Sequence, residues 1–126
     1  MSWKGKTILI AEDEESNFLY LEAVLSKTGV RMLWARNGQE VIDLCQEDTA
    51  IDLILMDLQM PILNGYEARE QIKALRPGLP QIAQTAFAMA DDEKRAMEAG
   101  FDSYISKPIR KNSLISLIEQ FIGSPD

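Results

Sequence analysis

The residues of this sequence that could do chemistry stand directly after short apolar runs. They are Glu12, Asp13, Glu14, Asp57, Thr85 and Lys107. Two carboxylates about 4 Å apart repel each other by roughly 4 kcal/mol at an effective dielectric constant of about 20. A cluster of such groups should therefore bind a cation or hold a carboxyl group with a raised pKa.

The residue types narrow this chemistry further. Oxygen ligands without nearby histidine or cysteine favour a hard ion, Mg²⁺ or Mn²⁺, which keeps several waters and shares its ligand shell with a phosphate. Lys107 adds a positive charge that suits phosphate oxygens. A carboxylate that faces both a metal ion and a lysine is a candidate phosphoryl acceptor.

Asp57 is the most informative of these residues, because it ends the run "IDLILMD", which is otherwise typical of a buried strand. An ionised aspartate is seldom fully buried without a partner. Taken alone, the others have plainer explanations. The acidic run 12–14 could favour the start of a helix, Thr85 could simply end a strand, and Lys107 could be a surface lysine. Their joint placement after four separate apolar runs favours a single site.

Five apolar runs rich in aliphatic residues are the predicted strands, at 7–11, 30–35, 51–57, 80–85 and 103–106. Each is followed by apolar residues at helical spacing. This alternation predicts parallel βαβ units with helices on both faces of the sheet. We therefore predict one α/β domain over residues 1–126, a doubly wound five-stranded parallel sheet, with residues 1–5 and 123–126 frayed. Ligands bind such sheets outside the carboxyl ends of the strands.

The predicted helices are marked by apolar positions and by residues typical of helix ends. The apolar positions are Phe18, Leu21 and Leu25 in the first helix, Val41, Leu44 and Cys45 in the second, Tyr66, Ile72 and Leu75 in the third, Ala96, Met97 and Ala99 in the fourth, and Leu114, Leu117, Ile118 and Phe121 in the fifth. Gly29 should end the first helix, and Asn37 suits the N-cap of the second. Pro77 follows the third, while Asp91 and Gly100 open and close the fourth.

Composition excludes several classes of function. The chain has 20 acidic and 13 basic residues, so a broad nucleic-acid-binding face is not expected. It has no histidine, which excludes histidine-based zinc sites, Ser-His catalysis and imidazole proton transfer. Its single cysteine, Cys45, is interpreted as a small buried hydrophobe. Because there is also no signal peptide and no apolar run long enough to span a bilayer, we expect a cytosolic protein.

Two stretches of the chain resemble the receiver domain of two-component response regulators. "ILIAEDE" is similar to the first strand of that family and its acidic pair, here Glu12 and Asp13. "LILMDLQMPILNGYE" is similar to the phosphoacceptor signature, with Asp57, Pro61 and Gly65 at the expected offsets.

Two further stretches extend the resemblance to nearly the whole chain. "QTAFA" supplies the hydroxyl, Thr85, and "GFDSYISKP" supplies the aromatic, Tyr104, and the lysine, Lys107. The combination is much more specific than any one motif. The resemblance implies a flavodoxin-like (βα)₅ fold with strand order 2-1-3-4-5, and a cis peptide between Lys107 and Pro108.

The resemblance also implies a role for each site residue. Asp57 would attack a phosphohistidine on a sensor histidine kinase and become an aspartyl phosphate. Asp13, Asp57 and the main-chain carbonyl of Gln59 would bind Mg²⁺, or Mn²⁺ as a substitute, with Glu12 helping directly or through water. Lys107 would pair with Asp57 and then with a phosphoryl oxygen.

The implied switch consists of Thr85 and Tyr104. Thr85 would donate to a phosphoryl oxygen and Tyr104 would turn inward behind it, remodelling the face built from the fourth helix, the fifth strand and the fifth helix. Tyr104 has a plainer interpretation as core filling. Gln59 and Phe87 lie two places beyond Asp57 and Thr85. Our hypothesis is that Phe87 shields the phosphoryl group and slows its hydrolysis.

Two settings fit such a domain. The opening "WKGKTILIAEDEESNFLYLEAVL", with Asn17 and a tryptophan before the first strand, looks more like the receivers of hybrid sensor histidine kinases. Those receivers relay the phosphoryl group to a histidine phosphotransfer protein. The alternative is a stand-alone single-domain response regulator. In either setting we expect a monomer or weak dimer that contacts neither nucleic acid nor membrane, in the cytoplasm or in the cytoplasmic part of a membrane-anchored kinase.

Two interpretations of a different class stay open. One is a receiver-like interaction module that is not phosphorylated, against which the complete set of site residues argues. The other is a small phosphohydrolase with an aspartate nucleophile and Mg²⁺. Such enzymes typically carry a second aspartate two residues later as general acid, where this chain has Gln59. We therefore expect a signalling domain that catalyses only its own phosphorylation and dephosphorylation.

Overall fold

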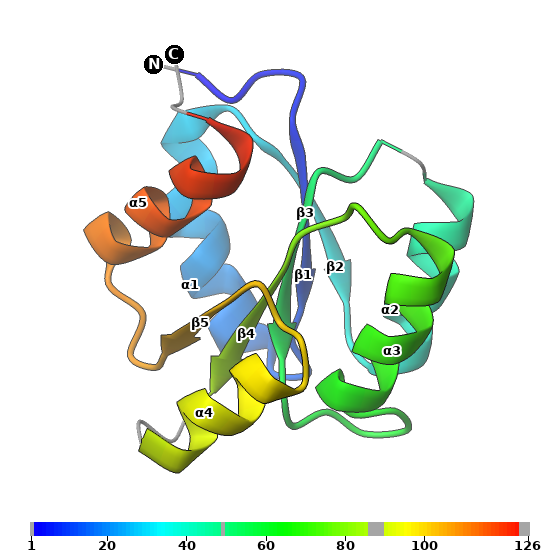
Figure 1. The fold of residues 1–126 in the computed structure, drawn as a ribbon. Coiled ribbons are helices and arrows are strands. Elements are labelled where there is room, and N and C mark those ends of the chain that lie inside the picture. Colours follow the sequence, from blue (N-terminus) through cyan, green and yellow to red (C-terminus); the bar gives the residue numbers. More distant parts are fainter. Residues whose placement is uncertain (1, 49, 86–89, 124–126) are drawn as a thin grey trace.

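A five-stranded parallel sheet forms the centre of the computed structural model, which describes residues 2–48, 50–85 and 90–123 (Figure 1). The strands are β1 (Thr7–Ala11), β2 (Arg31–Ala35), β3 (Leu53–Asp57), β4 (Gln81–Thr85) and β5 (Ser103–Ser106). Their order is β2-β1-β3-β4-β5, and every neighbouring pair is parallel. The predicted doubly wound fold and its strand order are confirmed.

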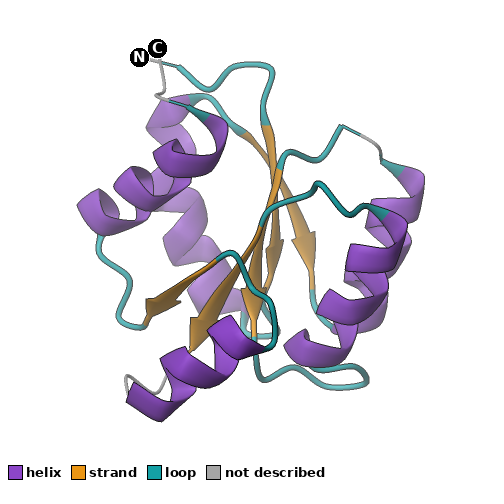
Figure 2. Cartoon of the chain, viewed as in Figure 1, coloured by secondary structure: helices purple, strands orange, loops and turns teal. Residues whose placement is uncertain are grey.

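Helices cover both faces of this sheet (Figure 2). α1 (Glu15–Leu25) and α5 (Lys111–Ile122) lie on one face, and α2 (Gly38–Glu47), α3 (Gly65–Leu75) and α4 (Ala90–Glu98) lie on the other. The side chains of the central strands alternate between the two cores, so β1 and β3 are buried throughout. Among the described residues, no helix combines the length and apolar character that crossing a membrane requires.

Local capping fixes where the helices begin and end. The side chain of Asn37 accepts a hydrogen bond from the amide of Glu40, as predicted for an N-cap. Asn64 and Glu67 form a reciprocal capping box at the start of α3. α1 is followed by one 3₁₀ turn, Ser26–Thr28. The helical segment ends at Gly29, whose φ of 78° lies in the left-handed region.

Several details differ from the sequence predictions. The predicted strands at 30–35, 51–57 and 80–85 begin one or two residues later, since Val30 and Ile51 are buried in the connections before their strands. α4 begins at Ala90 and not at Asp91. Leu75 and Met97 were assigned to buried helix faces, but they are 47% and 46% exposed. In these two helices, Ile72 and Ala96 are the residues that are fully buried in the core.

The ends of the described chain are less loose than predicted. Trp3 lies in the region 1–5 expected to be frayed, yet it is only 2% exposed. Its indole Nε1 donates a 2.8 Å hydrogen bond to the carbonyl of Gly123, the first residue of the other region expected to be frayed. The segment before β1 and the end of α5 lie at the end of the sheet away from the carboxyl ends of the strands (Figure 1). The prediction of frayed ends is therefore wrong for Trp3 and Gly123.

Candidate functional site

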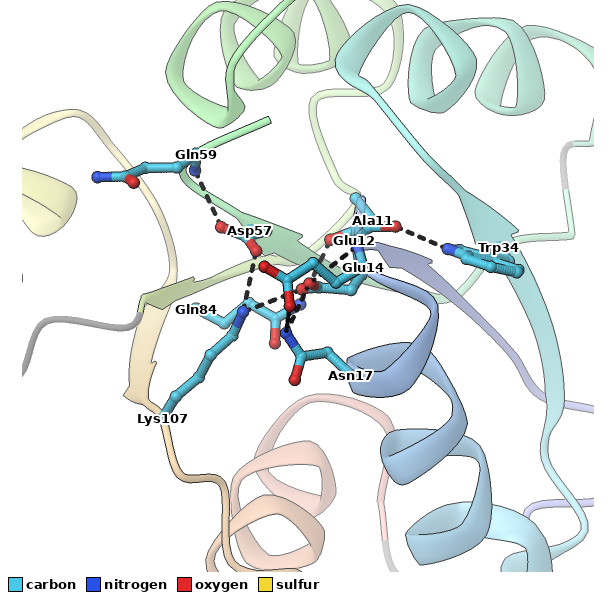
Figure 3. Close-up of polar contacts among 9 residues, drawn as sticks. All are labelled: Ala11, Glu12, Glu14, Asn17, Trp34, Asp57, Gln59, Gln84 and Lys107. Carbon is cyan, nitrogen blue, oxygen red and sulfur yellow. Dashed lines mark hydrogen bonds and ion pairs between the residues drawn. The ribbon is translucent and has the colours of Figure 1, made fainter. Parts of the chain in front are cut away.

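The carboxyl ends of the strands bring the chemically interesting residues to one edge of the sheet (Figure 3). Glu12 follows β1, Asp57 is the last residue of β3, Thr85 is the last of β4, and Lys107 follows β5. Residues as far apart in sequence as Glu12 and Lys107 are in hydrogen-bond contact there. The parallel topology, with every strand pointing the same way, produces this convergence.

Lys107 joins the two buried carboxylates of this edge. Its Nζ donates to Asp57 Oδ2 at 3.0 Å and to Glu12 Oε2 at 3.1 Å. Glu12 is fully buried and Asp57 is 6% exposed, so both charges are largely removed from water. Such burial is tolerated only when each charge has partners. The lysine is therefore an integral part of the site.

A third carboxylate makes this edge a candidate cation site. Glu12, Asp13 and Asp57 each offer a carboxylate oxygen, and these oxygens all lie within 4.8 Å of one another. Asp13 is exposed, so the cluster opens to solvent on its side. Three carboxylates face one ammonium, and the ligand atoms are all oxygens. This donor set fits a hard divalent cation such as Mg²⁺.

Burial and mutual repulsion shape the protonation of this cluster. Burial, assisted by the neighbouring Glu12, raises the pKa of Asp57 from 3.8 to about 7. Burial acts on Glu12 in the same direction, but hydrogen bonding with Asp57 and Asn17 and the charge of Lys107 outweigh it and lower its pKa. Burial alone would lower the pKa of Lys107, yet the two carboxylates raise it. The carboxylate pair therefore favours holding one proton, on Asp57, below about pH 7.

The loop after β3 is built closely around Asp57. The amide of Gln59 donates to Asp57 Oδ1 at 2.9 Å, and the amide of Gly65 donates to the carbonyl of Leu58 at 3.2 Å. A Cβ at position 65 would come within 2.5 Å of the carbonyl oxygen of Asp57, so only glycine fits here. The role of the Gln59 carbonyl as a metal ligand stays a prediction.

Two residues that support Glu12 were not identified as site residues from the sequence. Asn17 Nδ2 donates to Glu12 Oε1 at 3.0 Å, and Trp34 Nε1 donates to the carbonyl of Glu12 at 2.7 Å (Figure 3). The Trp34 ring stacks on Phe18 with ring centres 4.4 Å apart. The sequence signal for Asn17 was its place in the first turn of the helix after the acidic run. Trp34 is an aromatic with a polar group, near the end of the strand that pairs with β1.

Thr85 and Tyr104, the two residues predicted to form a switch, lie on β4 and β5. Thr85 is 4% exposed and lines a hollow of about 230 Å³ together with Gln59 and Arg95. Its carbonyl accepts a 2.7 Å hydrogen bond from the amide of Lys107. Tyr104 is half-buried and packs against the core beneath α2, α3 and α4, as its interpretation as core filling requires. Phe87 lies outside the described residues, so the shielding hypothesis stays a prediction.

Two other sequence predictions concern single positions near this edge. The peptide between Lys107 and Pro108 is cis, as the resemblance implied. Cys45 is buried in α2, and burial raises the pKa of its thiol to about 11. It is therefore a core residue and has no part in the site.

The sequence is similar to response regulators over most of its length. The sequence pattern of the response regulator receiver domain matches residues 8–119. The polar-differentiation response regulator DivK of Brucella anthropi is 40% identical over 121 residues, which cover 94% of this chain and 97% of DivK.

Two solved structures are similar over most of their length. The receiver domain of the sensor histidine kinase PA1611 from Pseudomonas aeruginosa, which has a magnesium ion coordinated in its active site cleft, is 33% identical with a TM-score of 0.86 and covers 95% of this chain and 99% of its own. The receiver domain of Ssk1 from Saccharomyces cerevisiae, solved with the histidine phosphotransfer protein Ypd1, is 30% identical with a TM-score of 0.84 and covers 92% and 88%.

Proposed function

This chain belongs to the response regulator receiver domain family, and from that premise we propose that it accepts a phosphoryl group on Asp57. The donor is a phosphohistidine of a sensor histidine kinase. A carboxylate oxygen of Asp57 forms the new bond to phosphorus, and the bond from phosphorus to the histidine nitrogen breaks with its electron pair on the imidazole. The observation that carries this proposal is the buried Asp57, held by Lys107 at 3.0 Å and surrounded by two further carboxylates.

The other residues orient and stabilise the phosphoryl group. Lys107 pairs with a phosphoryl oxygen, and Thr85 donates to another. Mg²⁺ bound by Glu12, Asp13 and Asp57, with the Gln59 carbonyl, would neutralise the cluster and remove the proton that Asp57 favours. The acidic cluster supports this cofactor, and the PA1611 receiver carries the same ion.

Phosphorylation would then act through directed contacts and not through bulk repulsion. Esterification removes one carboxylate charge, while the phosphoryl group brings about −1.5 to −2, so the site gains only roughly one negative charge. Thr85 and Tyr104 transmit the change to the face formed by α4, β5 and α5. The reader of that face, or the next acceptor, is a histidine phosphotransfer protein, as supported by the Ssk1 receiver with Ypd1.

The same chemistry operates in either setting of the domain. The PA1611 receiver supports an origin in a hybrid histidine kinase, and DivK supports a stand-alone response regulator equally well. We treat residues 1–126 as one receiver domain that works in the cytoplasm as a monomer or weak dimer. Both settings require Asp57 to accept the phosphoryl group.

The test is incubation with a small phosphodonor and Mg²⁺, followed by intact-mass measurement. We expect a phosphoryl adduct that is absent in Asp57→Asn and absent when EDTA removes the metal. Asp43→Asn, an exposed substitution on α2, is the matched control and should be phosphorylated normally. Continuous release of phosphate at high turnover would indicate a hydrolase instead. No adduct under any condition would indicate an interaction module.

A further inference from the structure

Gln84 is a buried amide next to the site that the phosphoryl chemistry described above does not use. It is 0% exposed and precedes Thr85 on β4, where it is the register partner of Asp57. Its side chain shares one face of the sheet with Ile105, its partner on β5, and Lys107 follows Ile105 by two residues. The amide of Gln84 and the end of the Lys107 side chain therefore lie beside each other (Figure 3).

The amide of Gln84 is incompletely paired. Its Nε2 makes one long hydrogen bond of 3.4 Å to the carbonyl of Ala11. Its Oε1 has no hydrogen-bond partner among the residues that the structure describes. Buried acceptors without a partner are rare and destabilising, so this oxygen calls for a donor. Gln84 also lines a pocket of about 310 Å³ between α1 and the loop after β5, which has room for water.

The side chain of Lys107 lines this pocket and has one N–H that no described residue accepts. An ammonium group has three N–H bonds, and the described residues accept two of them, at Glu12 and Asp57. The other side-chain donors that line the pocket are already used within the described part of the chain. Asn17 donates to Glu12 and Glu14, and the hydroxyl of Tyr20 donates to the carbonyl of Ile109.

We propose that Gln84 is a positioning residue for Lys107: one water in the pocket links the third N–H of the ammonium group to the Gln84 Oε1. This inference rests on the proposed phosphoryl transfer. Esterification of Asp57 takes away one acceptor of the ammonium, and a fixed neutral acceptor keeps Lys107 aimed at the phosphoryl oxygens. An amide serves better than a carboxylate here, because it orients the lysine without adding charge to a cluster of three acids.

The test compares Gln84→Met with Gln81→Met in the full chain. Gln81 is the matched control, since it is a 2% exposed glutamine on the same strand whose Oε1 also has no described partner, but it lies at the opposite end of β4 from the site. With a small phosphodonor, the maximal rate should fall about tenfold in Gln84→Met and stay unchanged in Gln81→Met. The Mg²⁺ dependence should be the same in all three proteins.

A second measurement reports on Lys107 whether or not phosphorylation occurs. In ¹⁵N-lysine-labelled protein, the ammonium signal of Lys107 should weaken through faster proton exchange in Gln84→Met. It should persist in Gln84→Glu, which keeps an acceptor. If the wild type takes no phosphoryl group, the proposed function fails, and this signal alone decides the position of Lys107.

Urea unfolding separates positioning from packing. Both methionine variants should unfold near the wild-type urea midpoint, because each loses a buried amide whose desolvation cost offsets much of what its hydrogen bonds contribute. The proposal is overturned if Gln84→Met keeps the wild-type rate and ammonium signal. It is also overturned if both variants lose rate and stability together, and Gln84→Leu repeats the comparison should Gln84→Met not fold.

Discussion

Asp57→Asn should make the metal-free protein more stable, and increasingly so as the pH rises. The substitution keeps the shape of the side chain and removes a buried charge that lies near another carboxylate. The folded-state pKa of Asp57, about 7, is above its ordinary value of 3.8. The folded protein therefore holds a proton that the unfolded chain has lost, and stability falls as the pH rises from about 4 to 7.

The structure sets the size of this effect. The pKa difference of about 3 units corresponds to about 4 kcal/mol at about 1.4 kcal/mol per unit, reached above pH 7. At pH 5, only the interval from 3.8 to 5 counts, so less than half of this free energy has been reached. Asp57→Asn should thus gain up to about 4 kcal/mol at pH 8 and less than half of that at pH 5.

The assay is urea unfolding followed by circular dichroism between pH 5 and pH 8 in EDTA. Asp43→Asn removes one acid from the exposed face of α2 and controls for net charge, so its stability difference from the wild type should stay flat with pH. Added Mg²⁺ should stabilise the wild type and narrow its gap to Asp57→Asn. A gain that does not grow between pH 5 and pH 8, or a loss of stability at pH 8, would refute the reasoning.

Three further predictions concern the framework around the site. Gly65→Ala should destabilise the fold by about 1 to 3 kcal/mol and slow phosphorylation, because its Cβ would meet the Asp57 carbonyl. Gly78→Ala, which meets nothing within 4 Å, should match the wild type in both assays, and equal behaviour of the two variants would contradict the packing argument. Trp3→Phe should lose about 1 kcal/mol in urea unfolding, as it removes the bond to Gly123; an unchanged midpoint would show that this bond contributes nothing. Because burial raises its pKa to about 11, Cys45 should react with a thiol reagent only in denaturant, and fast labelling of the native protein would disprove its burial.

Much of the site could be predicted from the sequence because parallel topology reduces a three-dimensional question to a one-dimensional one. Once alternating strands and helices are recognised, the residues after each strand must meet at one edge. Asp57 stood out since it breaks an apolar run, and Asn37 was identified by its side-chain chemistry. The order of the strands could not be deduced in this way, because many orders satisfy the same alternation. It was predicted from the family resemblance.

The contacts that position the site could not be predicted in the same way. Trp34 reaches the carbonyl of Glu12 only because β2 pairs with β1 in one register, and sequence does not state that register. The open acceptor of Gln84 is visible only when every neighbour has been placed. Apolar spacing also failed to separate Ala96, which reaches the core, from the adjacent and exposed Met97. In a short helix, one residue of rotation decides which side chain is covered.

The bond between Trp3 and Gly123 makes this domain suited to circular permutation. It brings the two ends of the described chain into contact at the end of the sheet where the strands begin (Figure 1), whereas Asp57 is the last residue of β3. A short flexible linker could join them, and new termini could be opened in the turn at Gly78, where an added Cβ would meet nothing within 4 Å. The phosphoryl-accepting edge would then keep its geometry while the order of its elements along the chain changed.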